Sequence, residues 1–305
     1  MSDEKKTILI TGGNSGLGFE CANNIASEFK EHTIVLACRD GKKAEAAVRN
    51  LVDATGNRNI FFMELDVASL PSVRNLVTRF NEQGLGPLDA LLCNAGINGR
   101  HSGLTQDGFD VIFETNHLGH FLLVNSLLPS MRQNGRIVVV SSDMHCPPGA
   151  NLVWPGVEEL AHPGEAFREN FIRYSFSKLC NLYFTYEIAR KLADAKSEIT
   201  VNAFNPGLLT DTNFAPDKSR FTDAFMAQVA DRTGSLEHSA KALADMMTSS
   251  RYEKITATYI DRGTECASSA LSRDGKNARE LWDMSVEYTR LAQSETLPGF
   301  PHAGQ

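Results

Sequence analysis

Short apolar runs alternate along the chain with longer segments whose apolar residues recur at helical spacing. The run Ile137–Val140 is continuous and β-branched, which is typical of a central parallel strand buried on both faces. Strands are predicted at 7–10, 33–37, 60–65, 88–93, 136–140, 200–204 and 257–260. Helices are predicted from 18 to about 29, around 44–47, and at 70–82, 108–131, 174–195, 219–231, 235–249 and 277–291. The alternation predicts an α/β fold, a Rossmann-type doubly wound parallel sheet with helices on both faces.

The whole chain, residues 1–305, is predicted to form one domain, because it contains no internal repeat, low-complexity run or linker. Two segments are added to the alternating pattern, an insertion at 143–173 and a helical tail at about 262–305. The apolar fraction of 42% allows a substantial core, and the net charge of −7 argues against a nucleic-acid partner. No apolar run approaches the ~20 residues that span a bilayer, so no transmembrane segment is expected.

The cysteines are scattered and form no Cys-x-x-Cys pair. They are Cys21, Cys38, Cys93, Cys146, Cys180 and Cys266. Most of them fall in predicted strands or helices, as reduced core thiols do, and the first residues contain no signal-peptide core. These features predict a cytoplasmic protein. The sequence does not fix the oligomeric state, and a homo-oligomer is compatible with it.

A glycine-rich loop joins the first predicted strand to the first helix. Its glycines, Gly12, Gly16 and Gly18, would let backbone amides approach a pyrophosphate at the positive end of the helix. A tight turn without a ligand is the alternative, but a position between a strand and a helix is the context that dinucleotide binding requires. The predicted cofactor site also includes the intervening loop residues Asn14, Ser15 and Leu17.

The end of the second strand is where the adenosine ribose of a dinucleotide is usually bound. Arg39 stands there, with Lys42 and Lys43 just beyond it. A guanidinium binds a 2′-phosphate through paired donors, whereas an acidic residue would repel it. The sequence therefore favours NADP(H) over NAD(H). Asp40 argues against this preference unless it caps the following helix instead.

Polar residues also follow later strands, at the sheet edge where open α/β sheets bind ligands. Asn94-Ala95-Gly96 follows the fourth strand, and its small residues would let a ligand lie close to the backbone. Ser141-Ser142 follows the fifth strand. Asn116 lies inside a predicted helix, where its amide needs hydrogen-bond partners. That placement indicates either a functional role or a satisfied amide in the core.

Tyr174 and Lys178 are four residues apart, so on a helix they lie on one face. A phenol normally titrates near pH ~10. A nearby ammonium favours the phenolate and is expected to lower the pKa of Tyr174 toward the working range. The pair is therefore a candidate acid–base device for interconverting an alcohol and a carbonyl. The spacing alone is weak evidence, because many solvated helices carry it.

Taken together, these motifs resemble those of the short-chain dehydrogenase/reductase family, in the same order, over residues 7 to about 261. They are the glycine loop, Asn94-Ala95-Gly96, Asn116, Ser142 and Tyr174-x-x-x-Lys178. Three local sequences, at 37–40, 115–121 and 177–181, look like one branch of that family. It contains the retinol dehydrogenases, the WW-domain-containing oxidoreductase and the light-dependent protochlorophyllide reductase. The resemblance implies an NADP-dependent oxidoreductase with a small-molecule substrate, an apolar aldehyde or ketone or a retinoid- or steroid-like compound.

The resemblance also implies a role for each matching residue. Tyr174 would be the general acid/base, and Lys178 would lower its pKa and hold the nicotinamide ribose. Ser142, rather than Ser141, would polarise the carbonyl oxygen, and Asn116 would hold a water in a proton relay. The remaining cofactor contacts would be Gly12, Gly16 and Gly18 in the loop, Asp66 and Val67 at the adenine, Asn94, Ala95 and Gly96 along the cleft, and Pro206 and Gly207 at the nicotinamide.

Two features depart from the family pattern. Ser142 and Tyr174 are 32 positions apart, wider than usual, and the insertion between them is rich in proline and aromatic residues. It could form a substrate wall or lid, or a surface excursion. After Pro206-Gly207 the family commonly has a threonine where this chain has Asp211, so either Thr210 or Thr212 is predicted to bind the carboxamide.

Other readings of the sequence stay open. A catalytically idle NADP(H)-binding regulator would have no chemical need for Asn116, Ser142, Tyr174 and Lys178 together. A tetrapyrrole reductase of the protochlorophyllide type lacks the serine that matches Ser142. His117 and His120 have a possible metal spacing but no third ligand cluster, so packing or hydrogen bonding and no metal is predicted. Four residues could line an apolar pocket over the nicotinamide or belong to the core: Phe214, Phe221, Phe225 and Met226.

Overall fold

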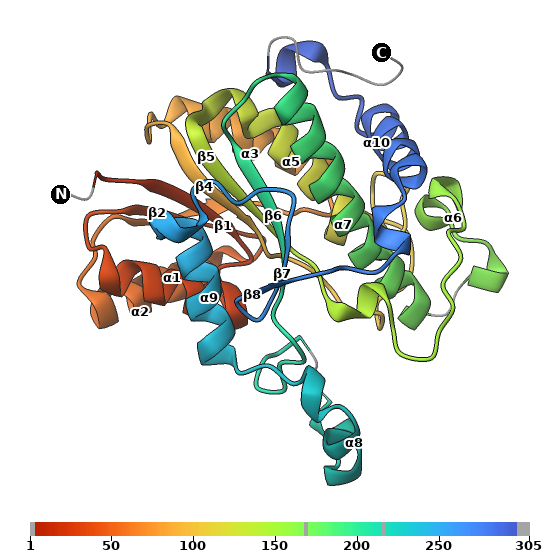
Figure 1. Ribbon diagram of the computed structural model, residues 1–305. Coiled ribbons are helices and arrows are strands. Elements are labelled where there is room, and N and C mark those ends of the chain that lie inside the picture. The colour runs from red at the N-terminus through yellow and green to blue at the C-terminus, as the bar shows by residue number, and fades with distance from the viewer. Residues whose placement is uncertain (1–3, 168–169, 215–216, 298–305) are drawn as a thin grey trace.

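An eight-stranded sheet runs through the centre of the protein in the order β3-β2-β1-β4-β5-β6-β7-β8 (Figure 1). The computed structural model describes residues 4–167, 170–214 and 217–297. Strands β1 to β7 pair in parallel, and β8 is antiparallel to β7. The strands are β1 Thr7–Thr11, β2 Thr33–Cys38, β3 Ile60–Glu64, β4 Leu88–Cys93, β5 Met131–Val140, β6 Thr200–Asn205, β7 Tyr259–Asp261 and β8 Thr264–Cys266. The winding direction changes between β1 and β4, which is where sheets of this kind bind ligands.

Helices cover both faces of the sheet, as the alternating pattern predicts (Figure 1). In β1, Ile8 and Ile10 pack into a core with α1, α2 and α9, whereas Leu9 packs into a second core with α3, α5, α7 and α10. This division follows from the two-residue period of a strand. The helices are α1 Gly16–Glu28, α2 Gly41–Thr55, α3 Leu70–Glu82, α4 Val111–Phe113, α5 Gly119–Leu127, α6 Val157–Ala161, α7 Asn170–Asp194, α8 Asp223–Gln228, α9 Leu236–Thr248 and α10 Gly275–Thr289.

Side-chain caps mark where helices α2 and α3 begin. Asp40 accepts a hydrogen bond from the backbone of Lys43 and caps α2, so the capping alternative considered for this residue is correct. Ser69 caps α3 in the same way, and Pro71 stands in the first turn of that helix. The carboxylate of Asp40 is therefore committed to the helix rather than left to face the end of β2.

The prediction of one continuous helix at 108–131 is wrong. The structure has the short α4, then a π-helical turn at Glu114–Leu118, then α5, and β5 already begins at Met131. The packing of Gly119 is one physical reason, since a Cβ on this residue would lie 1.9 Å from the carbonyl oxygen of Val67. The turn that precedes it must therefore bring the backbone very close to the loop after β3.

The insertion at 143–173 packs mainly against helices rather than standing out as a surface excursion. Trp154 makes an edge contact with Tyr183 of α7, with ring centroids 5.1 Å apart, and its indole donates to Glu280 of α10 at 2.9 Å. Tyr288 of α10 donates to Glu158 of α6 at 2.6 Å. Residues 168 and 169 of the insertion lie outside the described part of the chain. For the rest, the main contacts are with α7 and α10.

The tail begins with β8 rather than with a helix and then forms α10, which lies along α7 (Figure 1). Trp282 of α10 packs on Phe121 of α5 with ring centroids 5.0 Å apart, which extends the second core to the C-terminal part of the chain. Residues 298–305 of the predicted tail lie outside the described residues. Among the described helices, none combines the length and the apolar character needed to cross a membrane.

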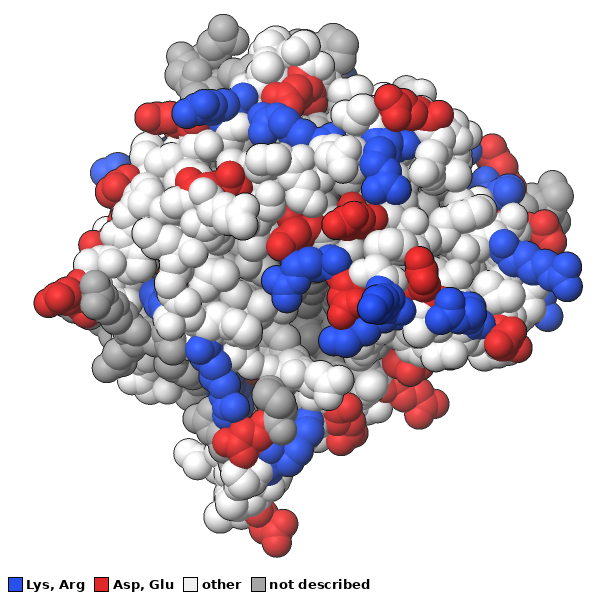
Figure 2. All heavy atoms as spheres, turned by 180° about the vertical axis from the view of Figure 1, so that it is seen from behind, with Lys and Arg blue, Asp and Glu red and all other residues white. Residues whose placement is uncertain are grey.

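Acidic and basic side chains are interspersed over the face shown in Figure 2. Helix α8 projects from the body in Figure 1 and buries none of its residues. It belongs to the region predicted as one helix at 219–231, which instead consists of two short 3-10 turns flanking α8.

Candidate active site

The four predicted catalytic residues lie at the carboxyl ends of β4 and β5. Ser142 follows β5, and Tyr174 stands on α7. The ammonium of Lys178, one turn further along α7, lies 5.7 Å from the centroid of the Tyr174 ring. A Cβ built on Gly96 would lie 3.1 Å from Asn116 Oδ1 and 3.8 Å from Lys178 Nζ. Asn116 and Lys178 thus meet at Gly96, Tyr174 lies beside Lys178, and the Lys178 ammonium contacts Val140, two residues before Ser142.

Asn116 uses its amide fully, which explains why it is tolerated inside a buried helical segment. Its Oδ1 accepts from the backbone N–H of Ile97 at 2.8 Å, and its Nδ2 donates to the carbonyl of Ile97 at 3.0 Å and to Ser177 Oγ at 2.9 Å. Asn116 therefore ties the π-helical turn both to the segment after β4 and to α7 beside Lys178. The water relay implied for this residue remains a prediction.

The expected effect of Lys178 on Tyr174 is wrong for this structure. Burial raises the pKa of Tyr174 above its ordinary value, the charge of Asp143 acts in the same direction, and the hydrogen bond with Ser142 opposes them. Burial also lowers the pKa of Lys178 to about 8, and its ammonium donates to the carbonyl of Val140 at 3.1 Å. The loss of hydration at Tyr174 and at Lys178 outweighs the effect that either group has on the pKa of the other. Tyr174 therefore holds its proton at neutral pH.

The two serines after β5 have different environments. Ser141 is buried and donates to the backbone carbonyl of Lys178 at 2.8 Å, which fixes the strand end to α7. Ser142 is only partly buried, and its hydroxyl donates to Asp143 Oδ1 and accepts from the backbone N–H of Met144, both at 3.1 Å. Its preference over Ser141 at a substrate oxygen stays a prediction.

The glycine loop has the geometry that close approach of a phosphate needs. Gly12 and Gly16 have φ of +66° and +53°. A Cβ on Gly18 would lie 2.6 Å from Asn94 Nδ2 and 2.8 Å from the carbonyl oxygen of Gly12. Asn94 in turn donates to the backbone carbonyl of Thr11 at 2.9 Å, so the loop and the segment after β4 form one unit.

Sequence reasoning missed Thr11 and the way His120 supports it. The hydroxyl of Thr11 accepts from the backbone N–H groups of Asn94 and Ala95, both at 2.9 Å, and lies 3.0 Å from His120 Nε2. Burial lowers the pKa of His120 to about 4, so its ring is neutral. A buried threonine at the end of a strand was the only available signal, and it is not specific enough to identify this bond network.

The cation predicted to bind the cofactor stands at the end of β2. Arg39 is exposed just after β2, with its Nη1 3.9 Å from Asp66 Oδ2. Asp66 also accepts from the backbone of Ala68 at 3.0 Å. A pocket of about 510 Å³ lies beside the glycine loop. Its lining residues are Asn14, Ser15, Phe19, Lys43, Ala46, Ala47, Asn50 and Asn213. Lys43, which the sequence analysis noted only as a neighbour of Arg39, thus lines this pocket.

The two candidate threonines after Pro206-Gly207 differ in position. Thr212 is buried, and its side-chain carbons lie 3.6 Å from the position of a Cβ on Gly16. The hydroxyl of Thr210 bonds to its neighbour Asp211 at 3.3 Å on the exposed side of the loop. Thr212 is therefore the threonine that borders the glycine loop.

Of the four apolar residues considered for a pocket, only Phe214 has a described ring contact with Tyr174. Its ring lies 5.8 Å from that of Tyr174, and its side chain is 41% exposed. Asn98 donates to the carbonyl of Phe214, and Arg100 pairs with Asp217 at 3.2 Å, so the segments after β4 and β6 meet beside Tyr174. Phe225 instead packs on Phe221 at 6.1 Å and belongs neither to the core nor to this contact.

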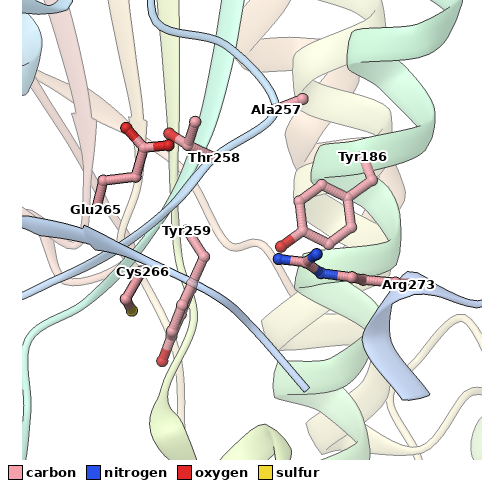
Figure 3. A pocket seen from close by; sticks show the side chains of 7 residues that line it. All are labelled: Tyr186, Ala257, Thr258, Tyr259, Glu265, Cys266 and Arg273. Carbon is pink, nitrogen blue, oxygen red and sulfur yellow. The ribbon is translucent and has the colours of Figure 1, made fainter. Parts of the chain in front are cut away.

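A second pocket, of about 330 Å³, lies between α7 and the β7–β8 hairpin (Figure 3). Its lining residues are Tyr186, Ala257, Thr258, Tyr259, Glu265, Cys266 and Arg273. None of them is a predicted site residue.

The two histidines of the π-helical region make hydrogen bonds, as predicted. His117 Nε2 lies 3.0 Å from Ser285 Oγ of α10, and His120 bonds to Thr11 as described above. Burial lowers the pKa of His117 to about 3. In the described part of the chain there is no group of three potential metal ligands.

Comparison with known proteins gives consistent matches. A family model described as short chain dehydrogenase matches residues 6–153. A WW domain-containing oxidoreductase from Gallus gallus is 32% identical over 288 residues, which are 93% of this chain and 68% of the relative. A polyprenol dehydrogenase from Danio rerio is 32% identical over 299 residues, which are 94% of this chain and 87% of the relative.

Solved structures match the whole fold. An uncharacterized protein from Mycobacterium paratuberculosis superimposes with a TM-score of 0.73 at 29% identity, covering 98% of this chain and 96% of that one. A variant of actinorhodin polyketide ketoreductase, solved with NADPH, gives a TM-score of 0.67 at 23% identity, covering 85% and 96% of the two chains. The second likeness is one of fold alone.

Proposed function

The chain belongs to the short-chain dehydrogenase/reductase family, and on this basis we propose that it is an NADP(H)-dependent enzyme that interconverts an apolar alcohol and its carbonyl compound. The observation that carries the proposal is that Asn116 and Lys178 meet at Gly96, with Tyr174 beside Lys178 and Ser142 just after the strand end that Lys178 contacts. A protein that only bound a dinucleotide would not need a phenol, a serine hydroxyl and a buried ammonium beside one another.

The glycine loop fits a dinucleotide. The positive φ values of Gly12 and Gly16 and the lack of room for a side chain on Gly18 would let a pyrophosphate approach the backbone of the loop. When bound, the nicotinamide supplies or accepts the hydride. The protein's part is to position the substrate and to handle the proton.

Tyr174 would give its hydroxyl proton to the carbonyl oxygen of a substrate during reduction. Its raised pKa keeps that proton in place at neutral pH, and the nearby ammonium of Lys178 would stabilise the phenolate that forms. Ser142, at the end of β5, would hold the same substrate oxygen. In alcohol oxidation the proton would move in the opposite direction.

Preference for NADP(H) over NAD(H) would come from Arg39 and Lys43. Arg39 is the first exposed side chain after β2, and its contact with Asp66 is long, at 3.9 Å. Lys43 lines the pocket beside the glycine loop. Both cations could bind a 2′-phosphate, while Asp40 is held as the cap of α2.

An apolar substrate is supported by the side chains near Tyr174. The exposed ring of Phe214 lies 5.8 Å from the ring of that residue. The relative from Danio rerio is a polyprenol dehydrogenase, an enzyme named for a long-chain isoprenoid alcohol. Long-chain apolar alcohols and aldehydes are therefore the first substrates to test, followed by retinoid- and steroid-like compounds.

The test is nicotinamide absorbance with NADPH and with NADH against such a panel. We expect turnover with NADPH, and a loss of kcat of about 10²-fold or more in Tyr174→Phe with NADPH binding retained. Tight NADPH binding without turnover of any carbonyl or alcohol would favour the catalytically idle regulator. Equal activity of Tyr174→Phe would remove the assigned proton donor.

A further inference from the structure

The turn that joins β7 to β8 contains an arginine in an unfavourable backbone conformation. Arg262 and Gly263 form this two-residue turn, with φ of +49° and +92°, between the paired residues Asp261 and Thr264. Hairpin turns in which both φ values are positive favour Asn-Gly, because few other side chains adopt a positive φ without strain. Arg262 therefore holds a conformation that an asparagine would adopt more easily.

The side chain of Arg262 bonds to two parts of the chain. Its Nε and Nη2 donate to the two carboxylate oxygens of Asp261, at 2.9 and 2.8 Å. Its Nη1 donates to the backbone carbonyls of Asp231 at 2.6 Å and of Thr233 at 3.2 Å. The backbone N–H of Arg262 donates to the carbonyl of Asn205, the last residue of β6, at 2.9 Å. Arg262 therefore links the end of β6 to the chain that precedes α9.

These two places are the ends of one long segment, which is described at 208–214 and 217–233. The N–H of Leu208 donates to the carbonyl of Arg232 at 2.8 Å, and the N–H of Gly234 donates to the carbonyl of Leu208 at 3.0 Å. A Cβ on Gly207 would lie 2.8 Å from the nitrogen of Gly234 and 3.0 Å from Cδ of Arg262. The two ends thus lie side by side, and the stem of Arg262 packs where they meet.

The segment borders the candidate active site between these ends. The side-chain carbons of Thr212 lie 3.6 Å from the position of a Cβ on Gly16, in the glycine loop. The ring of Phe214 lies 5.8 Å from the ring of Tyr174. The places of Thr212 and Phe214 therefore depend on how the ends of the segment are held.

We propose that Arg262 is a positioning residue: its side chain holds the two ends of the segment together and so sets where Thr212 meets the cofactor and where Phe214 meets the substrate. The inference rests on the proposed function, because it concerns the binding of NADPH and of an apolar substrate. The strained backbone of the turn is then the cost of placing a guanidinium at this point.

The test is Arg262→Asn, which gives the turn the favoured sequence Asn-Gly and removes four side-chain hydrogen bonds. The free energy of unfolding should fall little, because the easier turn offsets part of the lost bonds. KM for an apolar alcohol and the Kd of NADPH should each rise about 10-fold, because binding must then order a looser segment. Arg262→Lys keeps the charge but not the paired donors, so its constants should lie between those of the native protein and of Arg262→Asn.

Arg74→Gln is the matched control. Arg74 also bonds to both oxygens of a carboxylate, that of Glu295, and to a backbone carbonyl, that of Thr289, and so joins distant segments outside the site. This variant should lose stability with KM and Kd at their native values. The same result for Arg262→Asn would make Arg262 a structural residue only and would overturn the inference.

Limited digestion with trypsin separates the inference from the proposed function, because it needs no turnover. Cleavage after Lys218, which lies within the segment, should be about 10-fold faster in Arg262→Asn and unchanged in Arg74→Gln. If the native protein converts no substrate, the proposed function fails, while faster cleavage with a raised Kd of NADPH still supports the inference. Native values of both would contradict it. If Arg262→Asn does not fold, Asp261→Asn replaces it, with smaller changes in the same direction, because an amide oxygen accepts more weakly from Arg262 than a carboxylate does.

Discussion

Tyr174 can act as an acid over a wide pH range because its proton is held so firmly. Burial and the charge of Asp143 raise its pKa above the ordinary value. The acid form is the one needed for carbonyl reduction, so kcat/KM for reduction should stay level through neutral pH and fall only in the alkaline range, as Lys178 and then Tyr174 lose their protons. A pH profile measured with NADPH and an apolar aldehyde checks this. A fall centred near pH ~7 would assign the proton to another group.

At the adenosine end, Arg39 should decide between the two cofactors. Replacing it in Arg39→Leu removes a charge-assisted contact worth about 1.5–3 kcal/mol, which corresponds to roughly a 10–100-fold rise in the Kd of NADPH. The Kd of NADH should hardly change, because that cofactor has no 2′-phosphate. Titration of protein fluorescence with each cofactor measures both constants. Arg58→Leu, also exposed but outside the site, is the control.

Gly18 is needed for packing rather than for an unusual backbone conformation. In Gly18→Ala the new methyl would meet Asn94 Nδ2 at 2.6 Å and the backbone oxygen of Gly12 at 2.8 Å, so the loop must shift. We expect a loss of about 1–3 kcal/mol in the free energy of unfolding together with weaker NADPH binding. Urea denaturation and cofactor titration measure the two effects. Gly275→Ala, which meets only the flexible side chain of Arg279, should show neither.

At the scale of elements, the sequence predicts the parts of the site that local patterns encode. The glycine loop, the strand ends at Asn94 and Ser142, and the one-turn spacing of Tyr174 and Lys178 all follow from short-range patterns. The π-helical turn does not, because it depends on the bond of Asn116 to Ile97 and on contacts between segments far apart in the sequence. The direction of the Tyr174 pKa shift was missed for a related reason. Burial dominates it, and burial is a property of the assembled site.

A substitution in the insertion at 143–173 can test whether this segment stabilises the fold or contacts the substrate. Trp154 is half-buried between α7 and α10 and donates to Glu280. In Trp154→Ala we expect a loss of about 2 kcal/mol in the free energy of unfolding, below the range for a fully buried tryptophan. KM for an apolar substrate should not change. Val153→Ala, next to it and 73% exposed, is the control. A raised KM with unchanged stability would instead make the insertion a substrate wall.

At the scale of the whole molecule, the order of parallel strands and the two helical layers follow from the alternation of apolar runs and amphipathic segments. The antiparallel β8 does not, because its residues, Thr264–Cys266, are exposed and carry no apolar pattern. The packing of α10 on α5 and α7 also joins distant parts of the chain, for example through His117 and Ser285. Contacts of this kind place three buried titratable residues, Glu114, His117 and His120, on adjacent turns of one segment.

These three residues should make the free energy of unfolding fall at both acidic and alkaline pH. Burial raises the pKa of Glu114 from 4.5 to about 8, so its contribution is fully present below pH 4.5 and is lost as the pH rises toward 8. Burial lowers the pKa values of His117 and His120 from 6.5 to about 3 and 4, so their contribution is present above 6.5 and is lost as the pH falls. Glu114 therefore lowers the stability on the alkaline side of the optimum, and the two histidines lower it on the acidic side.

Glu114→Gln should therefore remove the loss of stability on the alkaline side of the optimum and leave the loss on the acidic side unchanged. The amide has nearly the same shape and no charge to bury, so the variant should gain on the native chain by up to about 1.4 kcal/mol per pH unit between pH ~5 and ~8. Urea denaturation at several pH values measures the difference. Glu82→Gln, at an exposed position at the end of α3, should give a curve parallel to the native one. A parallel curve for Glu114→Gln as well would mean that Glu114 is ionised in the folded protein.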